Sequence, residues 1–341
     1  MGLEKLLFGL SLALACHRSV VAGQIYVDAN NTSGIEDGTI QHPYASIHSA
    51  NNISANNDEI IVSPGVYEGS IEILKDITLR SENPTDSATV ENTIIDSEDF
   101  GSGILLVGES GPQNLTCRIQ GFTIANGQNE GGGIFCHPGG SPNSIIENNI
   151  IRDNYATGPP ASIPKGGGIW GFDGIIQNNI FYGNMAVEGA ALYQCNGIIR
   201  NNTFYGNTAS EGPALYDCET AVIQNNIIWA NIAYGVPGQI FNTSIPSYNC
   251  IQDVLEFGGN ISQDPRFVNP LNNDFHLLMA SPCIDAGSVT NLNADFEGNN
   301  RPHNACDWGI RGDGSHFDIG AFEFTGQVSQ TSSISGWNIY H

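Results

Sequence analysis

Seven aromatic residues recur at regular intervals, and the chemistry open to them is stacking against the rings of a sugar. The first column of aromatic residues contains Phe135, Trp170, Tyr193 and Tyr216, and the second column contains Tyr182, Tyr205 and Trp229. Each member of the first column follows isoleucine or leucine, so strand alternation points the ring outward if the aliphatic residue points inward. Apolar ring faces with polar edges suit carbohydrate. The alternative is structural, with rings that stack inside the fold or shield a sheet edge.

Carboxylates near the C-terminal end are the candidates for a metal site. Residues 312–318 contain Asp313 and Asp318, and carboxylate oxygens are ligands that Ca²⁺ prefers. The alternative is a local role, in which the carboxylates cap loops through Asx turns and pair with Arg301. Calcium, bound by Asp313 and Asp318, is the one cofactor that the sequence indicates.

Four copies of one short unit lie among the aromatic residues and indicate how these are positioned. The copies are mostly β-branched runs around an Asn-Asn pair, at residues 145–151, 175–181, 198–204 and 222–228. Their second asparagines, which are separated by 30, 23 and 24 residues, are Asn149, Asn179, Asn202 and Asn226. A glycine-rich series runs in step with them. Short β-branched runs between Asn and Gly turns predict strands rather than helices.

A β-solenoid explains this period best, because a leucine-rich repeat of similar length would need more regularly spaced leucines. Each unit would form one coil, and strands of successive coils would pair in parallel. The amide of asparagine carries donors and an acceptor, so the four second asparagines can form a structural ladder from coil to coil. Cys195 and Cys218 fall in the same register. Parallel Cβ vectors favour stacked free thiols there over a disulfide.

The repeats resemble those of the pectin-lyase-like superfamily of right-handed parallel β-helix proteins. The pairing of Gly-Gly-x-Ile, as at residues 166–169, with Phe-x-x-Asn, as at residues 181–184, is similar to repeats of chlamydial-type polymorphic outer-membrane proteins. Residues 58–67 are similar to the first coils of pectin methylesterases. The resemblance implies an all-β fold, a right-handed parallel β-helix. To it we add a short N-terminal capping helix over residues 44–51 and an irregular C-terminal cap.

The downstream segments at residues 264–268, 281–287 and 318–323 resemble the choice-of-anchor Q module, which usually closes a bacterial surface β-helix. Cys283 and Cys306 flank one loop-rich segment of this module, and we expect them to form a disulfide. The expected organisation is a signal peptide (1–23), an N-terminal cap (24–57), the β-helix coils (58–253), the C-terminal module (254–324) and a flexible tail (325–341).

An apolar run of ten residues behind Lys5 is typical of a signal peptide and is too short to span a bilayer as a helix. We expect cleavage near Gly23. A second option is a lipoprotein-type cleavage that leaves Cys16 lipidated. In both cases the protein would be secreted or held at the cell surface, without a transmembrane segment.

The net charge of −24 limits the partners. A protein of this charge repels nucleic acid and anionic membranes. It also repels polyuronates such as pectate or alginate unless calcium bridges the two. A polysaccharide or cell-surface glycan remains as partner, although simple solubility explains the charge equally well. We expect a monomer.

Two functions compete. The first is adhesin-like, non-catalytic binding of carbohydrate or another surface ligand by a face of the solenoid. The second, which the resemblance implies, is a calcium-assisted polysaccharide lyase or related carbohydrate-active enzyme, and such lyases commonly use Lys or Arg as the base. The candidate bases are Lys165, Arg152 and Arg200, but no basic pair recurs at one strand position. The scarcity of basic residues, 11 in the whole chain, favours binding over catalysis.

Overall fold

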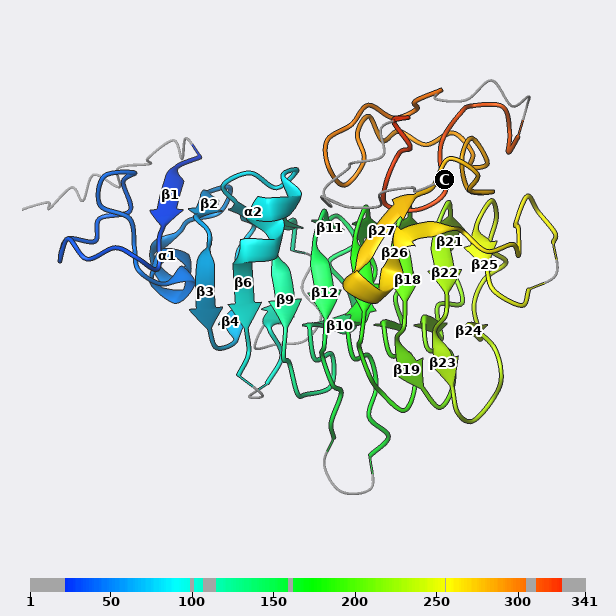
Figure 1. The fold of residues 1–341 in the computed structure, drawn as a ribbon. Coiled ribbons are helices and arrows are strands. Elements are labelled where there is room, and N and C mark those ends of the chain that lie inside the picture. Colours follow the sequence, from blue (N-terminus) through cyan, green and yellow to red (C-terminus); the bar gives the residue numbers. More distant parts are fainter. Residues whose placement is uncertain are drawn as a thin grey trace, which may run out of the picture.

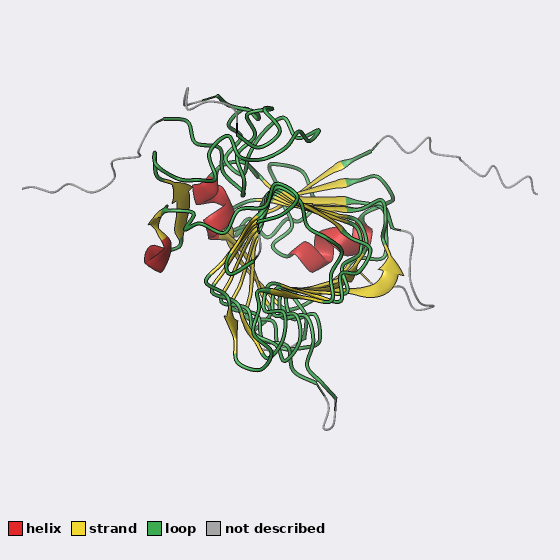
Figure 2. Ribbon diagram, turned by 90° about the vertical axis from the view of Figure 1, so that its right-hand side faces the viewer, coloured by secondary structure: helices red, strands yellow, loops and turns green. Residues whose placement is uncertain are grey.

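Each repeat unit folds into one coil that contributes a strand to each of three parallel sheets (Figures 1 and 2). The computed structural model describes residues 22–98, 101–106, 115–158, 162–254, 256–304 and 311–326. Within these ranges the chain is mostly β and forms a parallel β-solenoid with little helix, which confirms the predicted fold class. Figure 2 looks along the solenoid and shows its three-sided section.

The three sheets run the length of the solenoid and are named A, B and C here. Sheet A contains β1 (Gln24–Val27), β2 (Glu59–Val62), β5 (Thr78–Ser81), β8 (Arg118–Gln120), β11 (Ile145–Glu147), β14 (Ile175–Gln177), β17 (Ile198–Arg200) and β21 (Val222–Gln224). Sheet B contains β3 (Gly65–Glu68), β6 (Thr93–Asp96), β9 (Thr123–Ala125), β12 (Ile150–Arg152), β15 (Ile180–Tyr182), β18 (Thr203–Tyr205), β22 (Ile227–Trp229) and β25 (Cys250–Ile251). Sheet C contains β4 (Ile71–Glu72), β7 (Ile104–Leu106), β10 (Ile134–Gly140), β13 (Ile169–Phe172), β16 (Leu192–Tyr193), β20 (Leu215–Tyr216) and β24 (Ile240–Phe241). A smaller parallel pair joins β19 (Thr208–Ala209) to β23 (Ile232–Ala233).

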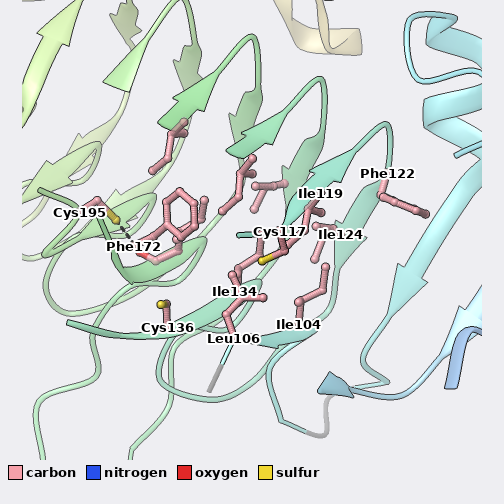
Figure 3. Packing of buried hydrophobic residues seen from close by; sticks show 14 of the residues in the cluster. Ile104, Leu106, Cys117, Ile119, Phe122, Ile124, Ile134, Cys136, Phe172 and Cys195 are labelled. Atoms are coloured by element: carbon pink, nitrogen blue, oxygen red, sulfur yellow. Dashed lines mark hydrogen bonds between the residues drawn. The ribbon is translucent and has the colours of Figure 1, made fainter. Parts of the chain in front are cut away.

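Strand alternation decides which side chains fill the coil. In sheet A, Ile146 pairs with Ile176 in the next coil and Ile176 pairs with Ile199, and all three side chains are fully buried. Figure 3 shows the same arrangement within one coil, where Ile119, Ile124 and Ile134 come from three different sheets and point into one core. Burial of these stacked aliphatic side chains stabilises each coil against its neighbours.

The second asparagines of the repeats form a buried ladder at the corner between sheets A and B. Both the backbone amide and the Nδ2 of Asn179 donate to Oδ1 of Asn202, at 2.9 and 3.1 Å. Asn202 donates in the same way to Asn226, at 2.9 and 3.0 Å. Asn149 begins this run above Asn179, and Asn249 continues it below Asn226. Because the corner lies inside the protein, these amides supply the hydrogen bonds that water cannot.

A short helix, α1 (Ile47–Ile53), closes the N-terminal end of the solenoid, slightly later in the chain than the 44–51 expected. Ser46 caps it by accepting a hydrogen bond from the backbone amide of Ser49 at 3.2 Å. Ile47 and Ala50 are buried against the core of the first coils. The sequence analysis missed a second helix, α2 (Ser87–Asn92), which lies beside sheet B and whose N-cap is Asp86. None of the helices in the described ranges is long and apolar enough to cross a bilayer.

The C-terminal module lies along the outer face of sheet B rather than closing the end of the solenoid as a cap (Figure 1). It begins with an antiparallel hairpin of β26 (Phe267–Asn269) and β27 (Asp274–Leu277), joined by the 3-10 turn η1 (Pro270–Asn272). Phe275, Ile319 and Ala321 of the module pack in one buried cluster with Ile150 and Ile180 of sheet B. Sheet B therefore carries apolar residues on both faces, since its inner face belongs to the core.

Replacing Asn202 by Ala should destabilise the solenoid by about 3 kcal/mol, because it leaves two buried donors of Asn179 without an acceptor. The free energy of unfolding, measured by urea denaturation, tests this. Asn52 is exposed, so Asn52→Ala is the matched control and should change stability by less than about 0.5 kcal/mol. Equal losses in both variants would contradict a structural role for the ladder.

Candidate functional site

The first aromatic column lies on the outer face of sheet C, and its rings contact one another from coil to coil. Ring centroids are 5.1 Å apart for Phe135 and Trp170 and 5.7 Å apart for Trp170 and Tyr193, with nearly perpendicular planes. The next pairs are parallel: Tyr193 and Tyr216 at 5.5 Å, and Tyr216 and Phe241 at 5.2 Å. Phe241 thus extends the column by one ring that the sequence analysis did not include.

This stacking leaves less free ring surface at Tyr193 and Tyr216 for the sugar contact that the sequence analysis expects, and that contact stays a prediction. Parallel rings in a stack turn their faces to each other, and a sugar needs a free face. Tyr216 has a ring on each side. The ammonium of Lys165 lies 4.9 Å from the ring centroid of Tyr193, which is only 3% exposed. These contacts match the structural alternative of the sequence analysis, in which the rings pack along the sheet.

The second aromatic column lies on the outer face of sheet B and is partly covered by the C-terminal module. The ring of Tyr205 packs 5.2 Å from Phe275 and 5.9 Å from Phe267. Trp229 is also packed against this cluster. Module side chains thus cover part of Tyr205, and the ligand role expected for Tyr205 and Trp229 stays a prediction. Tyr182 differs, since it packs on Phe275 at 6.0 Å and also borders a cleft.

The three candidate bases lie on three different sides of the solenoid and do not converge. Arg152 is on sheet B and pairs with Asp153 at 2.6 Å. Arg200 is on sheet A, where it donates to Oε1 of Gln177 at 2.7 and 3.0 Å. Lys165 borders sheet C, and its hydrogen bond to Tyr193 and the charge of Glu188 raise the pKa of its ammonium. Lys165 is thus protonated at neutral pH, which makes it a poor general base.

A cleft lies between sheet B, helix α2 and the C-terminal module. Its volume is about 1120 Å³. The floor consists of β9, β12 and β15, with Ile150, Arg152 and Tyr182. Helix α2 forms one wall through Ser87 and Glu91, and β27 with the loops around residues 297 and 323 forms the other. A cleft of this size, lined by aromatic and polar side chains, is the default place for a ligand.

A charged triad holds the module side of this cleft together. Nδ1 of His276 is 2.7 Å from Asp274, and Nε2 is 3.1 Å from Glu297. Burial alone would lower the pKa of His276, but its hydrogen bonds to Glu297 and Asp274 outweigh burial and raise the pKa to about 9. His276 therefore carries a positive charge at neutral pH. The pKa of Glu297 is lowered by the same bond.

The candidate calcium ligands accept hydrogen bonds from backbone amides instead. Asp313 accepts from Val289 and Ser315, at 2.8 and 2.9 Å. Asp318 is fully buried and accepts from Asp285 and Phe324, at 2.7 and 2.6 Å. Within the part of the chain that the structure describes, no three acidic, histidine or cysteine side chains group as a metal site. The geometry matches the loop-capping alternative, and the salt bridge of Arg301 goes to Glu323, at 2.8 Å.

The first asparagines of the repeats, which the sequence analysis left without a role, attach the module to the solenoid. They point outward from backbone in the left-handed region, with φ between 51° and 55°. Their Nδ2 atoms donate to carbonyls of the module, from Asn148 to Phe296 at 2.8 Å and from Asn225 to Ser288 at 2.7 Å. Asn178 and Asn201 bind the module in the same way. The Asn-Asn pairs therefore position one wall of the cleft.

Five cysteines of the solenoid carry free, buried thiols: Cys117, Cys136, Cys195, Cys218 and Cys250. Cys195 and Cys218 are fully buried in the solenoid core, and burial raises the pKa of both thiols. Cys283 is buried between the module and sheet B. Cys306 lies outside the described residues, so its pairing with Cys283 stays a prediction.

A comparison with protein-family models agrees with this fold. Residues 76–244 match the family model described as a right handed beta helix region. A pectin methylesterase from Aspergillus niger in deglycosylated form matches with 15% identity and a TM-score of 0.42, over 72% of this chain and 82% of that chain. Pectate lyase Pel9A matches with 14% identity and a TM-score of 0.31, over 88% and 96% of the two chains. No curated protein sequence matches.

His276 makes the stability of the protein depend on pH. Its pKa is raised from 6.5 to about 9 on folding, so its stabilising contribution is complete below the unfolded value and is lost as pH rises through the folded one. After a discount for its partial exposure, the loss between these two pH values should be about 1 kcal/mol. Urea denaturation across this range tests the expectation, and His276→Asn should flatten the curve. An identical pH dependence in wild type and variant would contradict it.

Proposed function

We propose that this chain is an exported, adhesin-like β-helix protein that binds carbohydrate without catalysis, and that the cleft beside sheet B is the binding site. The observation that carries the proposal is the position of Tyr182. Its ring stands in a polar cleft beside Arg152, whereas most other column rings are stacked or covered. A ring with a polar edge next to charged hydrogen-bonding groups suits a sugar.

The polar lining supports an oligosaccharide rather than an apolar ligand. Asn272, Asn273 and Asn299 line the cleft together with Arg152 and His276. Toward the hydroxyl groups of a sugar, a side-chain amide can donate and accept hydrogen bonds, a guanidinium donates and a carboxylate accepts. The volume of about 1120 Å³ admits several sugar rings and not only one small molecule.

The competing function, a polysaccharide lyase, requires an unprotonated side chain as its base, and the candidate bases do not provide one in the cleft. Lys165 is protonated and covers Tyr193, and it lies on sheet C, away from the cleft. Arg152 lines the cleft but is paired with Asp153 at 2.6 Å. A charged and paired side chain cannot accept the proton that β-elimination removes. Binding is thus the function that the described geometry supports best.

Substitution of Tyr182 by Ala should weaken binding to the best ligand of a glycan array about tenfold, through loss of the ring contact. Tyr234→Ala is the matched control, because Tyr234 is exposed on another part of the solenoid. Trp170→Ala tests the first column and should leave binding unchanged. The proposal fails if no glycan binds, or if Trp170→Ala weakens binding and Tyr182→Ala does not.

Incubation with uronic-acid polymers, with and without calcium, should yield no unsaturated product in ultraviolet absorbance. The reason is the protonated state of Lys165, whose pKa is raised. Product formation that disappears in Lys165→Ala would replace the binding function by lyase activity.

A further inference from the structure

We infer that the cleft selects a glycan with protonated amino groups, such as an oligomer of glucosamine, over neutral or acidic glycans. The inference rests on the proposed function and deepens it by naming the ligand class. It comes from the charges that face the cleft and from the place of Tyr182 among them.

Apart from Glu323, which is buried and paired with Arg301, four carboxylates and two cations line the cleft. The carboxylates are Glu91, Asp153, Asp274 and Glu297, and the cations are Arg152 and His276. The pair of Glu323 and Arg301 is fully buried, with its charges 2.8 Å apart, and adds no net charge. The lining therefore carries two negative charges that its own cations do not balance.

The cations are held by carboxylates and are not free to bind an anion. Arg152 is 2.6 Å from Asp153, and His276 lies between Asp274 and Glu297. A uronate entering the cleft would have to compete with these partners. It would also approach a chain whose net charge is −24. Electrostatic repulsion of this kind lowers the association rate of acidic ligands.

One of the two unbalanced negative charges, that of Glu91, lies on the same cleft lining as Tyr182, and the other belongs to the group of Asp274, His276 and Glu297. Burial raises the pKa of Tyr182, the charge of Arg152 lowers it, and the charges of Asp153 at the end of β12 and Glu91 on α2 raise it. Glu91 is exposed, and no ion pair of Glu91 occurs among the residues that the structure describes. An ammonium group at this position can pair with Glu91 and lie against the ring of Tyr182. A hydroxyl or acetamido group gains neither charge interaction.

The test compares four oligomers of equal length by calorimetry at about pH 6, where amino groups are protonated. They are oligomers of glucosamine, of N-acetylglucosamine and of galacturonate, with oligolysine as a charge control. Glucosamine should bind most tightly and galacturonate least. Glu91→Gln should weaken glucosamine binding about threefold and leave N-acetylglucosamine unchanged. Glu211→Gln is the matched control, because Glu211 is in the charge environment of Tyr216, on the side of sheet C.

The outcomes separate this inference from the proposed function. If N-acetylglucosamine or galacturonate binds as tightly as glucosamine and Tyr182→Ala still weakens binding, the amine preference is overturned and carbohydrate binding stands. Equal affinity for oligolysine would overturn the preference for a sugar by showing charge attraction alone. If none of the saccharides binds, both the inference and the proposed function fall. Equal effects of Glu91→Gln and Glu211→Gln would also overturn the inference, since they would place the charge effect outside the cleft.

Discussion

The hydrogen-bonded asparagine ladder at the corner between sheets A and B is the interaction on which the other features depend. At this corner the chain leaves one sheet and enters the next, so backbone amides such as those of Asn179 and Asn202 have no strand partner. Each finds the side-chain oxygen of the following asparagine, at 2.9 Å in both cases. The price of burying a polar side chain is thereby offset by bonds to both neighbouring coils. Because the ladder repeats in register, successive strands stay aligned and the aliphatic side chains inside the coil stack on their equivalents.

The outward asparagine of each pair binds the C-terminal module, so the module is held in register with the coils. Asn148 and Asn225 lie several coils apart, yet both bind carbonyls of the module, at 2.8 and 2.7 Å. The module is therefore fixed along sheet B, and its Phe275 and Ile319 are buried in the cluster between module and sheet. The cleft is a consequence of this attachment, since its floor belongs to the solenoid and one wall to the module. Its charge is a consequence too, because His276 and Glu297 come from the module whereas Arg152 and Asp153 come from a coil.

The solenoid was predictable from the sequence because a repeated pattern reports a repeated environment. Ile146 and Ile176 occupy equivalent positions, and the spacing of Asn149 and Asn179 set the coil length without any knowledge of contacts. The cleft was not predictable in this way. Glu91 and His276 are far from Arg152 in the chain and lie outside the repeats, and only the folding of the module against sheet B brings His276 to the cleft. The two asparagines of a pair also look alike in the sequence. That one points inward and the other outward depends on the left-handed backbone of the first, as at Asn201, where φ is 52°.

Amide hydrogen exchange followed by NMR tests the ladder most directly. The backbone amides of Asn179 and Asn202 donate to buried asparagine side chains, and that of Thr220 donates to the side chain of Asn196 on the exposed surface, at 3.1 Å. All three hydrogen bonds join a backbone amide to the side-chain oxygen of an asparagine, and they differ in burial. We expect the amides of Asn179 and Asn202 to exchange only when the solenoid unfolds, and the amide of Thr220 to exchange through local opening. Exchange of all three amides at similar, fast rates would show that the ladder does not hold the coils together.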